Sequence, residues 1–148
     1  MADFDQLKLG NQLCFPLYTA SRLVVRSYTP LLKKLEITYP QYLVMLVLWE
    51  HKTLAVTQIT KLLLLDTSTL TPLLKRLEKM NLIWRKRSDS DERVVMIGLT
   101  DKGEKLQQEA AMIPSKLVEG LNFSEEELTL LYQLLYKYIH QASGKVEI

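Results

Sequence analysis

The feature that most constrains the fold is a single β-prone region set among helical patterns. Residues 82–87 and 93–99 are rich in strand-forming side chains, and the charged segment 88–92 between them has the composition of a turn. Before this region, apolar residues recur at spacings of three and four over residues 54–65, and again after the capping run 66–69. The order of helix, short turn, helix and hairpin predicts a mainly α protein with a small β-hairpin, arranged as a winged helix-turn-helix.

Helix-start signals indicate further helices on both sides of this motif. Thr38 followed by Pro40 predicts a helix that runs to His51. Three more segments are expected to be helical: residues 11–35, residues 100–119 after the cap Thr100, and residues 125 to about 143 after a capping box that begins at Ser124. Within the first of these, Pro16 and Pro30 each remove a backbone donor, and we expect them to kink or break the helix.

Positive charge is concentrated in the predicted helix-turn-helix and hairpin. Residues 61–93 hold eight basic and five acidic side chains, whereas the rest of the chain holds 11 basic and 12 acidic ones. A local excess of lysine and arginine favours contact with the DNA backbone, and a single helix fits the major groove. We expect the second helix of the motif and the hairpin to contact DNA through these residues: Ser68, Thr69, Thr71, Lys75, Arg76, Arg85, Lys86, Arg87, Asp91 and Arg93.

The two ends of the chain are predicted to form a dimer interface. A length of 148 residues suits a single domain. In the last helix, the apolar residues between 128 and 139 cover an arc of roughly 240°, whereas a helix with one buried side needs about 100°. We therefore divide the domain 1–148 into dimerisation helices at 1–37 and 101–148 and a DNA-binding region at 38–100.

Composition and motif content argue against several other classes of protein. The longest apolar run, residues 42–49, is far shorter than the about 20 residues that cross a membrane, and the N-terminus lacks the apolar core of a secretion signal. The single Cys14 cannot form an internal disulfide, which is typical of a cytoplasmic protein. Because His51 and His140 lie apart from other metal ligands, and no phosphate loop or nucleophile motif is present, we expect no metal, no cofactor and no enzyme activity.

Motifs in both halves of the sequence resemble one family of bacterial regulators. Three segments resemble the DNA-binding core of the MarR family: Asp66–Glu78 (DTSTLTPLLKRLE), Arg85–Arg93 (RKRSDSDER) and Leu99–Gly103 (LTDKG). Three others are similar to its cysteine-sensing branch, the organic hydroperoxide resistance regulators: Asn11–Phe15 (NQLCF), Tyr28–Leu32 (YTPLL) and Ile37–Tyr42 (ITYPQY). The resemblance covers about residues 7–140. Its wing motif is specific to the large family, and the cysteine and tyrosine segments are specific to the branch.

This resemblance implies a redox sensor at Cys14. It implies a dimeric repressor that releases a pseudo-palindromic DNA operator when an organic hydroperoxide oxidises the thiol, with a low-molecular-weight thiol as the next reactant. In the family, tyrosines that match Tyr28 and Tyr39 of the partner subunit donate hydrogen bonds to the sulfur, and Tyr18 is placed to line the site. In one continuous helix, Cys14 and Tyr28 would lie about 21 Å apart. The site therefore lies across a dimer interface, unless the helix breaks sharply.

The sequence departs from the family pattern at two places, and two other functions stay open. Thr67 and Ser68 stand where this branch usually has Ser and Gly, and Pro16 lies two residues after Cys14. The first alternative is a regulator of the same fold in which a small aromatic ligand fills the interface and Cys14 is inert. The second is a one-cysteine peroxidase that consumes hydroperoxides, although it gives no reason for the basic hairpin.

Overall fold

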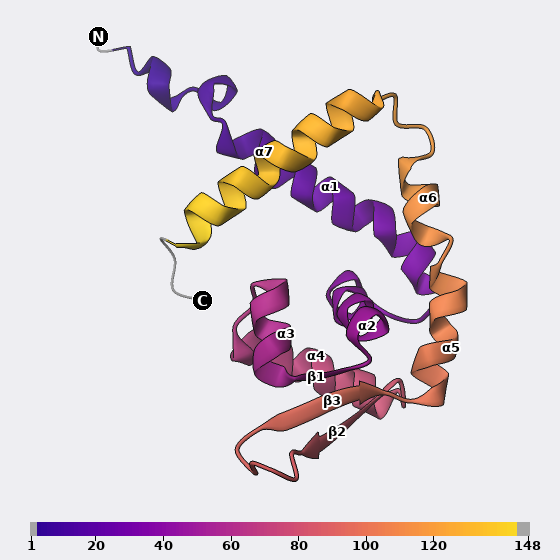
Figure 1. Ribbon diagram of the computed structural model, residues 1–148. Helices are drawn as coiled ribbons and strands as arrows, with labels where there is room; N and C mark the ends of the chain where they lie inside the picture. The colour runs from indigo at the N-terminus through magenta and orange to yellow at the C-terminus, as the bar shows by residue number, and fades with distance from the viewer. Residues whose placement is uncertain (1–2, 145–148) are drawn as a thin grey trace.

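The computed structural model describes residues 3–144, which are mainly helical with a small sheet, as predicted (Figure 1). The helices are α1 (Cys14–Lys33), α2 (Tyr39–His51), α3 (Val56–Leu63), α4 (Thr67–Lys79), α5 (Asp101–Ala110), α6 (Ile113–Val118) and α7 (Glu125–Ser143), after two 3-10 turns, η1 (Asp5–Leu7) and η2 (Leu9–Asn11). The strands β1 (Thr53–Ala55), β2 (Ile83–Arg87) and β3 (Val95–Leu99) form an antiparallel sheet in the order β1-β3-β2. The predicted domain ends at 1–2 and 145–148 lie outside the described residues.

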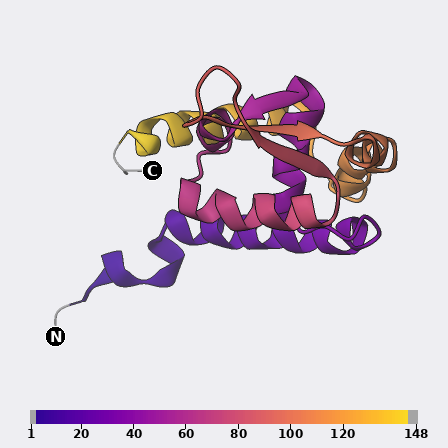
Figure 2. The ribbon, with the colours of Figure 1, turned by 90° about the horizontal axis from the view of Figure 1, so that it is seen from below.

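The hydrophobic core lies between the sheet and helices α2 to α4, in the lower half of Figure 1. Helix α4 contributes Leu70, Leu74 and Leu77 at helical spacing, and β3 contributes Ile97; all four side chains are buried. Because these leucines occupy one stripe of α4, its opposite face is left to polar residues. The β2–β3 loop projects from this body in both Figures 1 and 2.

Short hydrogen bonds fix both ends of the segment from α4 to α5. Asp66 caps α4 by accepting a bond from the Thr69 N–H (2.6 Å). After the hairpin, the Thr100 hydroxyl donates to the Asn81 carbonyl (2.6 Å) and accepts from the Gly103 N–H (3.0 Å). The hairpin of β2 and β3 with its loop, called the wing below, is therefore joined to α4 and α5 at one fixed corner. Asp66 and Thr100 act as the helix caps that the sequence predicted.

Two expected helices have different limits in the structure. The helix expected at 54–65 begins at Val56, because residues 53–55 pair with β3 as a third strand. The helix expected at 100–119 is interrupted at residues 111–112 and restarts as α6, whose first turn contains Pro114. Proline favours a first turn because its missing N–H is not needed there.

Helix α1 is continuous, which corrects the expected effect of its two prolines. Pro16 lies in the first turn, where a proline fits for the same reason, and Pro30 lies close to the end of the helix, which continues past it to Lys33. The helix begins at Cys14 rather than at residue 11, since the preceding residues form the turn η2. Cys14 and Tyr28 are therefore separated along an unbroken helix.

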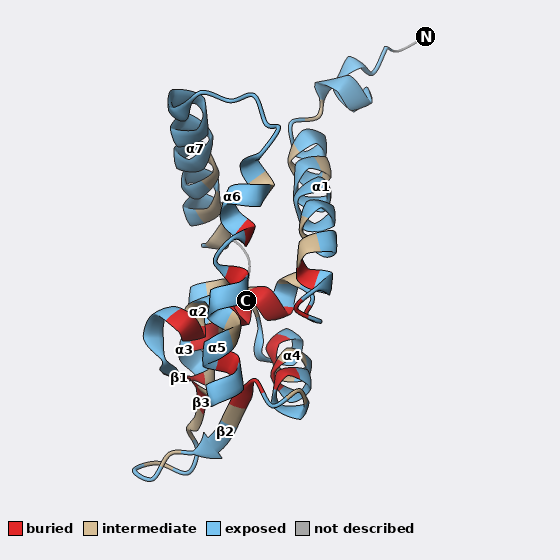
Figure 3. Cartoon of the chain, turned by 90° about the vertical axis from the view of Figure 1, so that its right-hand side faces the viewer, coloured by how far each residue is buried: buried red, intermediate tan, exposed pale blue. Residues whose placement is uncertain are grey.

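Helices α1 and α7 extend away from the body and contain almost no buried residues (Figure 3). In α1 only Leu32 is buried, near the end that joins the body, and α7 has no buried residue. Both helices nevertheless carry large apolar side chains, such as Leu23 (54% exposed) and Leu130 (57% exposed). Their apolar faces are not covered within one chain, yet none of the helices in residues 3–144 is long and apolar enough to cross a membrane.

Candidate DNA interface and cysteine site

The polar face of α4 presents the residues that the sequence predicted as DNA contacts. Thr71 is half-buried, and the other four are exposed: Ser68, Thr69, Lys75 and Arg76. The Ser68 hydroxyl donates to the Asp66 carboxylate (2.7 Å), and the Thr71 hydroxyl donates to the Thr67 carbonyl (2.8 Å). Hydrogen bonds from Ser68 and then Thr69 hold the pKa of the Asp66 carboxyl below its usual value. The helix therefore begins with a firmly capped turn.

Two arginines of the wing are each held by a carboxylate. The Arg85 Nε lies 3.0 Å from an oxygen of Glu78, which belongs to α4. Arg93 donates from Nε (3.1 Å) and Nη2 (3.3 Å) to the two oxygens of Asp91, and the hydrogen bonds of Arg93 lower the pKa of the Asp91 carboxyl. Arg87 donates to a carbonyl of the loop (2.7 Å). Asp91 thus orients Arg93, while the role of Glu78 had no signal in the sequence.

The pleat of β2 places its basic residues on two faces of the sheet. Arg85 faces α4, where it meets Glu78. Trp84 packs on the other face against Gly98 of β3, where an added Cβ would collide with the indole ring. Because alternate residues of a strand share a face, Lys86 lies on the Trp84 side, with its Nζ 5.6 Å from the centre of the ring.

A cavity of about 310 Å³ lies between the wing and the first turns of α3 and α4. Arg85 and Arg93 line it from the wing, Thr57 lines it from α3, and Thr67 and Thr71 line it from α4. Guanidinium groups and hydroxyls are the groups that proteins use to contact phosphates and base edges. The fold therefore brings together basic and hydroxyl residues that lie up to 36 positions apart in the sequence.

Cys14 is exposed at the first residue of α1, and the structure does not bring it to the predicted tyrosines within one chain. Because α1 is continuous, Tyr28 lies about 21 Å further along the helix. Tyr18 lies one turn after Cys14, is exposed, and stacks against the guanidinium of Arg22 at 4.8 Å.

The predicted tyrosines do meet each other, in an aromatic cluster at the junction of α1 and α2. The ring centres of Tyr28 and Tyr39 are 4.6 Å apart, and those of Tyr28 and Tyr42 are 5.5 Å apart. Burial, reinforced by the neighbouring Tyr39 and Tyr42, raises the pKa of Tyr28 to about 12, and burial also raises the pKa of Tyr39. Both phenols therefore stay protonated at neutral pH and can donate hydrogen bonds. The sequence did not single out Tyr42, which lies in a run of apolar residues typical of a core.

An apolar cleft of about 550 Å³ separates α1 from α7. Leu17 and Val24 line it from α1, Leu131 and Leu135 line it from α7, and Tyr39 also borders it. Figure 3 shows the two helices as separate arms. A cleft of this composition suits a hydrocarbon or aromatic group, or the apolar face of another helix.

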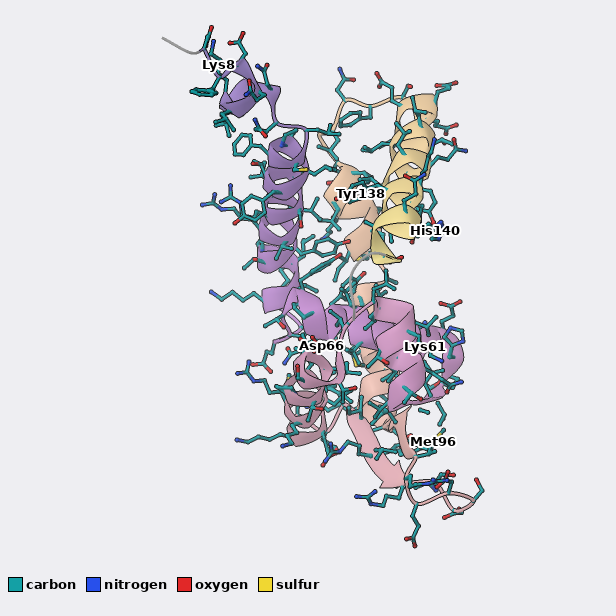
Figure 4. All side chains as sticks on the ribbon, turned by 90° about the vertical axis from the view of Figure 1, so that its left-hand side faces the viewer. Lys8, Lys61, Asp66, Met96, Tyr138 and His140 are labelled. Atoms are coloured by element: carbon teal, nitrogen blue, oxygen red, sulfur yellow. The ribbon has the colours of Figure 1, made fainter. Side chains whose placement is uncertain are left out.

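The described residues contain no cluster that could hold a metal ion. No group of three or more His, Cys, Asp or Glu side chains converges anywhere in residues 3–144. His140, labelled with Tyr138 on α7 in Figure 4, lies beside the ring of Tyr136 at 6.0 Å. The Nε2 of His51 lies 3.8 Å from a carboxylate oxygen of Glu50.

The chain is similar to proteins that are named as transcription regulators. Residues 26–110 match the family of transcriptional regulators SarA/Rot. The chain is 52% identical over 142 residues to the organic hydroperoxide resistance transcriptional regulator of Bacillus subtilis strain 168, which covers 96% of this chain and 97% of that protein. It is 44% identical over 137 residues to the HTH-type transcriptional regulator MgrA of Staphylococcus aureus, with 92% and 93% covered.

A solved structure of a DNA-bound protein has a similar fold. Reduced AbfR bound to DNA aligns with a TM-score of 0.83 and 35% identity, over 97% of this chain and 99% of that one. AbfR, from Staphylococcus epidermidis, has also been solved in an overoxidised state on DNA and in a disulfide-formed state. These similarities extend over nearly the whole length, through the wing motif and the cysteine and tyrosine segments. The chain therefore belongs to the MarR and SarA/Rot family of transcriptional regulators, in the branch of the organic hydroperoxide resistance regulators.

Proposed function

We propose that the protein is a homodimeric, DNA-binding repressor that loses affinity for its operator when an organic hydroperoxide oxidises Cys14. The observation that carries this proposal is that one chain holds both the cavity between α4 and the wing, which Arg85 and Arg93 line, and an exposed thiol at the first residue of α1. The similarity to a named hydroperoxide resistance regulator and to a DNA-bound structure of AbfR supports both halves. The DNA-binding region is assigned to residues 38–100, and dimerisation to the helices at both ends.

The DNA half follows from the placement of α4 and the wing. The polar face of α4 enters the major groove, and Arg93 at the edge of the loop reaches the neighbouring backbone or minor groove. In a two-fold dimer the two α4 helices would read half-sites roughly 34 Å apart. Arg93→Ala is then expected to reduce the log–log salt slope of operator binding by about one unit. Arg22→Ala on α1 serves as the control and should leave the slope unchanged.

The sensing half requires a second copy of the chain. Because Cys14 lies far from Tyr28 along α1, we assign the hydrogen-bond donors to Tyr28 and Tyr39 of the partner subunit, with Tyr18 lining the pocket. A dimer through α1 and α7 would also cover the apolar faces that these helices expose. Hydrogen bonds to the sulfur favour its charged form, and the thiolate is the reactive species.

The reaction is a two-electron oxidation of the sulfur. The Cys14 thiolate attacks the distal oxygen of the hydroperoxide, so that an S–O bond forms, the O–O bond breaks, and the alkoxide leaves as the alcohol after taking up a proton. The resulting sulfenic acid is then attacked by a low-molecular-weight thiol, which forms a mixed disulfide and releases water. The chain has one cysteine, so this second sulfur comes from outside the chain.

The product changes packing at the proposed interface. An adduct at Cys14 adds bulk beside tyrosines and apolar side chains, and such overpacking costs about 1–3 kcal/mol. A shift of the two DNA-binding regions relative to each other would relieve this overpacking but would move them out of register with the operator. A coupling energy of this size lowers operator affinity about 5- to 150-fold.

A mobility-shift titration tests the proposal. The wild type and Cys14→Ser bind the same operator duplex, with and without cumene hydroperoxide and a small thiol, while mass spectrometry follows Cys14. We expect release by the wild type alone, in step with the mass change at Cys14. With excess small thiol present, the sensor should consume about one equivalent of peroxide per Cys14 and stop at the mixed disulfide; consumption of many equivalents, with the thiol as the reductant, would instead indicate the peroxidase.

The apolar cleft between α1 and α7 supports one alternative, a regulator that responds to a small aromatic ligand. Its volume of about 550 Å³ is sufficient for such a molecule, and Tyr39 supplies a polar group at its border. In that case a substituted phenol would release DNA from the wild type and from Cys14→Ser equally, with no change in the mass of Cys14.

A further inference from the structure

Glu78 makes a contact across the proposed DNA interface that the function described so far does not use. It lies in the last turn of α4 and forms an ion pair with Arg85 of β2, with 3.0 Å between the Arg85 Nε and a Glu78 carboxylate oxygen. Both side chains are partly withdrawn from solvent, at 33% exposed for Arg85 and 45% for Glu78. The pair therefore joins the helix that would enter the major groove to the strand that leads into the wing.

The geometry leaves the outer end of Arg85 available. An arginine side chain has five N–H donors. Glu78 contacts Arg85 at Nε, so the two terminal amino groups of Arg85 do not form this ion pair. The same side chain lines the cavity that Arg93 and the α4 threonines also line. β2 is itself held by its pairing with β3, where Arg85 stands opposite Ile97. Backbone and side chain of Arg85 are thus both restrained.

We propose that Glu78 is a positioning residue that holds Arg85 for sequence-specific DNA binding. This inference rests on the proposed DNA-binding function. A carboxylate beside the interface repels phosphates and lowers affinity for any DNA. It also removes rotamer freedom from a long side chain before binding, so less entropy is lost when Arg85 meets its contact. The repulsion weakens binding to every DNA sequence, whereas the restraint on Arg85 strengthens binding only to a sequence that offers Arg85 its contact. The pair therefore lowers overall affinity but increases the preference for one DNA sequence over others.

Asp91 and Arg93 form a second pair of the same kind in the loop. The two pairs differ in what they connect. Asp91 and Arg93 belong to one loop, whereas Glu78 belongs to α4 and Arg85 to β2. Of these two pairs, the Glu78 pair is the one that joins the wing to α4, and the relative placement of wing and helix determines whether both can contact DNA in one register.

The test compares affinity for two duplexes of equal length. One is the duplex that wild type enriches from a random-sequence library, and the other is an unselected random duplex. Glu78→Gln removes the charge, and Glu78→Asp keeps the charge but shortens the reach by one methylene. Glu92→Gln is the matched control, because it removes a charge from the same wing and its carboxylate pairs with no cation within residues 3–144.

We expect both Glu78 variants to lower the ratio of selected to random affinity about two- to fivefold, which is the range that an exposed ion pair is worth. Glu78→Gln should also strengthen binding to the random duplex, whereas Glu78→Asp should not. Glu92→Gln should strengthen binding to both duplexes equally and leave the ratio unchanged. Arg85→Lys should lower the ratio as well, and combining it with Glu78→Gln should add little.

The possible failures are distinguishable. If the wild type enriches no duplex, the proposed DNA-binding function is wrong. If the wild type enriches a duplex but Glu78→Gln and Glu92→Gln shift the two affinities alike, Glu78 acts as a charge alone and the positioning role is overturned. Thermal unfolding of each variant identifies any loss of affinity that comes from loss of fold, and in that case Glu78→Asp and Arg85→Lys decide the question.

Discussion

At the scale of single residues, the two proposed sites use polar groups in opposite ways. The arginines of the wing keep their charge and are held by carboxylates, as in the pairs Glu78–Arg85 and Asp91–Arg93. Tyr28 and Tyr39 are instead kept neutral by burial, which raises the pKa of both phenols. A neutral phenol can donate a hydrogen bond to a thiolate without competing for its proton. The DNA site therefore depends on charge, and the thiol site depends on donors in an apolar setting.

Removal of one phenol hydroxyl tests this use of Tyr28. A hydrogen bond to a charged group is worth about 1.5–3 kcal/mol, so its loss leaves a smaller fraction of Cys14 as the reactive thiolate. Tyr28→Phe should therefore slow the oxidation of Cys14 by cumene hydroperoxide about tenfold or more at neutral pH. Stopped-flow or quenched mass spectrometry measures the rate, and operator binding by the reduced protein should not change.

Tyr42→Phe is the matched control for this variant. Tyr42 belongs to the same aromatic cluster but is only 2% exposed, so its hydroxyl is not available to a second chain. Oxidation at the wild-type rate is expected for Tyr42→Phe. Equal rates for the two variants, whether both slow or both fast, would contradict the assignment of Tyr28 as a donor.

At the scale of elements, local signals in the sequence predicted most of the fold. The caps Asp66, Thr100 and Ser124 each bond to a backbone N–H three residues later, so four consecutive residues contain the whole signal. The strand β1 has no such signal, because its three residues become a strand only by pairing with β3, about 40 positions away. The Glu78–Arg85 pair is hidden for a related reason, since the chain turns between the two residues.

The candidate site was predictable to a similar degree. The basic residues of α4 and the wing could be found from charge and element order, but the faces of β2 that they occupy depend on pairing with β3. Cys14 and the tyrosines were assigned from a family resemblance and not from spacing. Within one chain the helix α1 keeps Cys14 and Tyr28 apart, so no argument from a single chain could have joined them.

The corner between the wing and α5 depends on the absence of a side chain at Gly103. An added Cβ at this position would collide with the carbonyl oxygen of Leu82, which is backbone and cannot turn aside. Gly103→Ala should therefore destabilise the protein by about 1–3 kcal/mol, toward the upper end of that range, as measured by urea unfolding. Gly10→Ala meets no atom within 4 Å and should be close to neutral; similar losses for both would show that the corner is not tightly packed.

The start of α4 should make stability depend on pH in acid. Hydrogen bonds hold the pKa of Asp66 below its usual 3.8. A lowered pKa in the folded state means that this stabilisation is fully present above the unfolded value and is lost as pH falls through the folded value. Asp66→Asn keeps an oxygen acceptor but does not titrate. Denaturant unfolding should show a gap in stability between wild type and Asp66→Asn that narrows below pH 3.8, and a gap independent of pH would contradict this account.

At the scale of the whole molecule, the body and the arms have different requirements. The body around α2 to α5 has a buried core of its own, and α1 and α7 extend from it as separate arms (Figures 1 and 3). These arms expose apolar faces on both sides of a cleft. The body therefore needs no second chain for its packing, but the arms do. The same pairing of arms would bring each Cys14 to the partner's tyrosines, so assembly and sensing would depend on one interface.

This shared interface predicts complementation between two defective chains. Cys14→Ser has no thiol, and in Tyr28→Phe every thiol faces a phenylalanine of the partner subunit. A heterodimer of the two contains one site that joins a normal Cys14 to a normal Tyr28, and one site that lacks both. Unfolding and refolding an equal mixture should give heterodimers as half of all dimers. Two thiols remain in each Tyr28→Phe homodimer and one in each heterodimer, so half of all thiols should oxidise at the wild-type rate. If the site lay within one chain, every remaining thiol would face its own Phe and all would oxidise slowly, and quenched mass spectrometry of Cys14 separates these two outcomes.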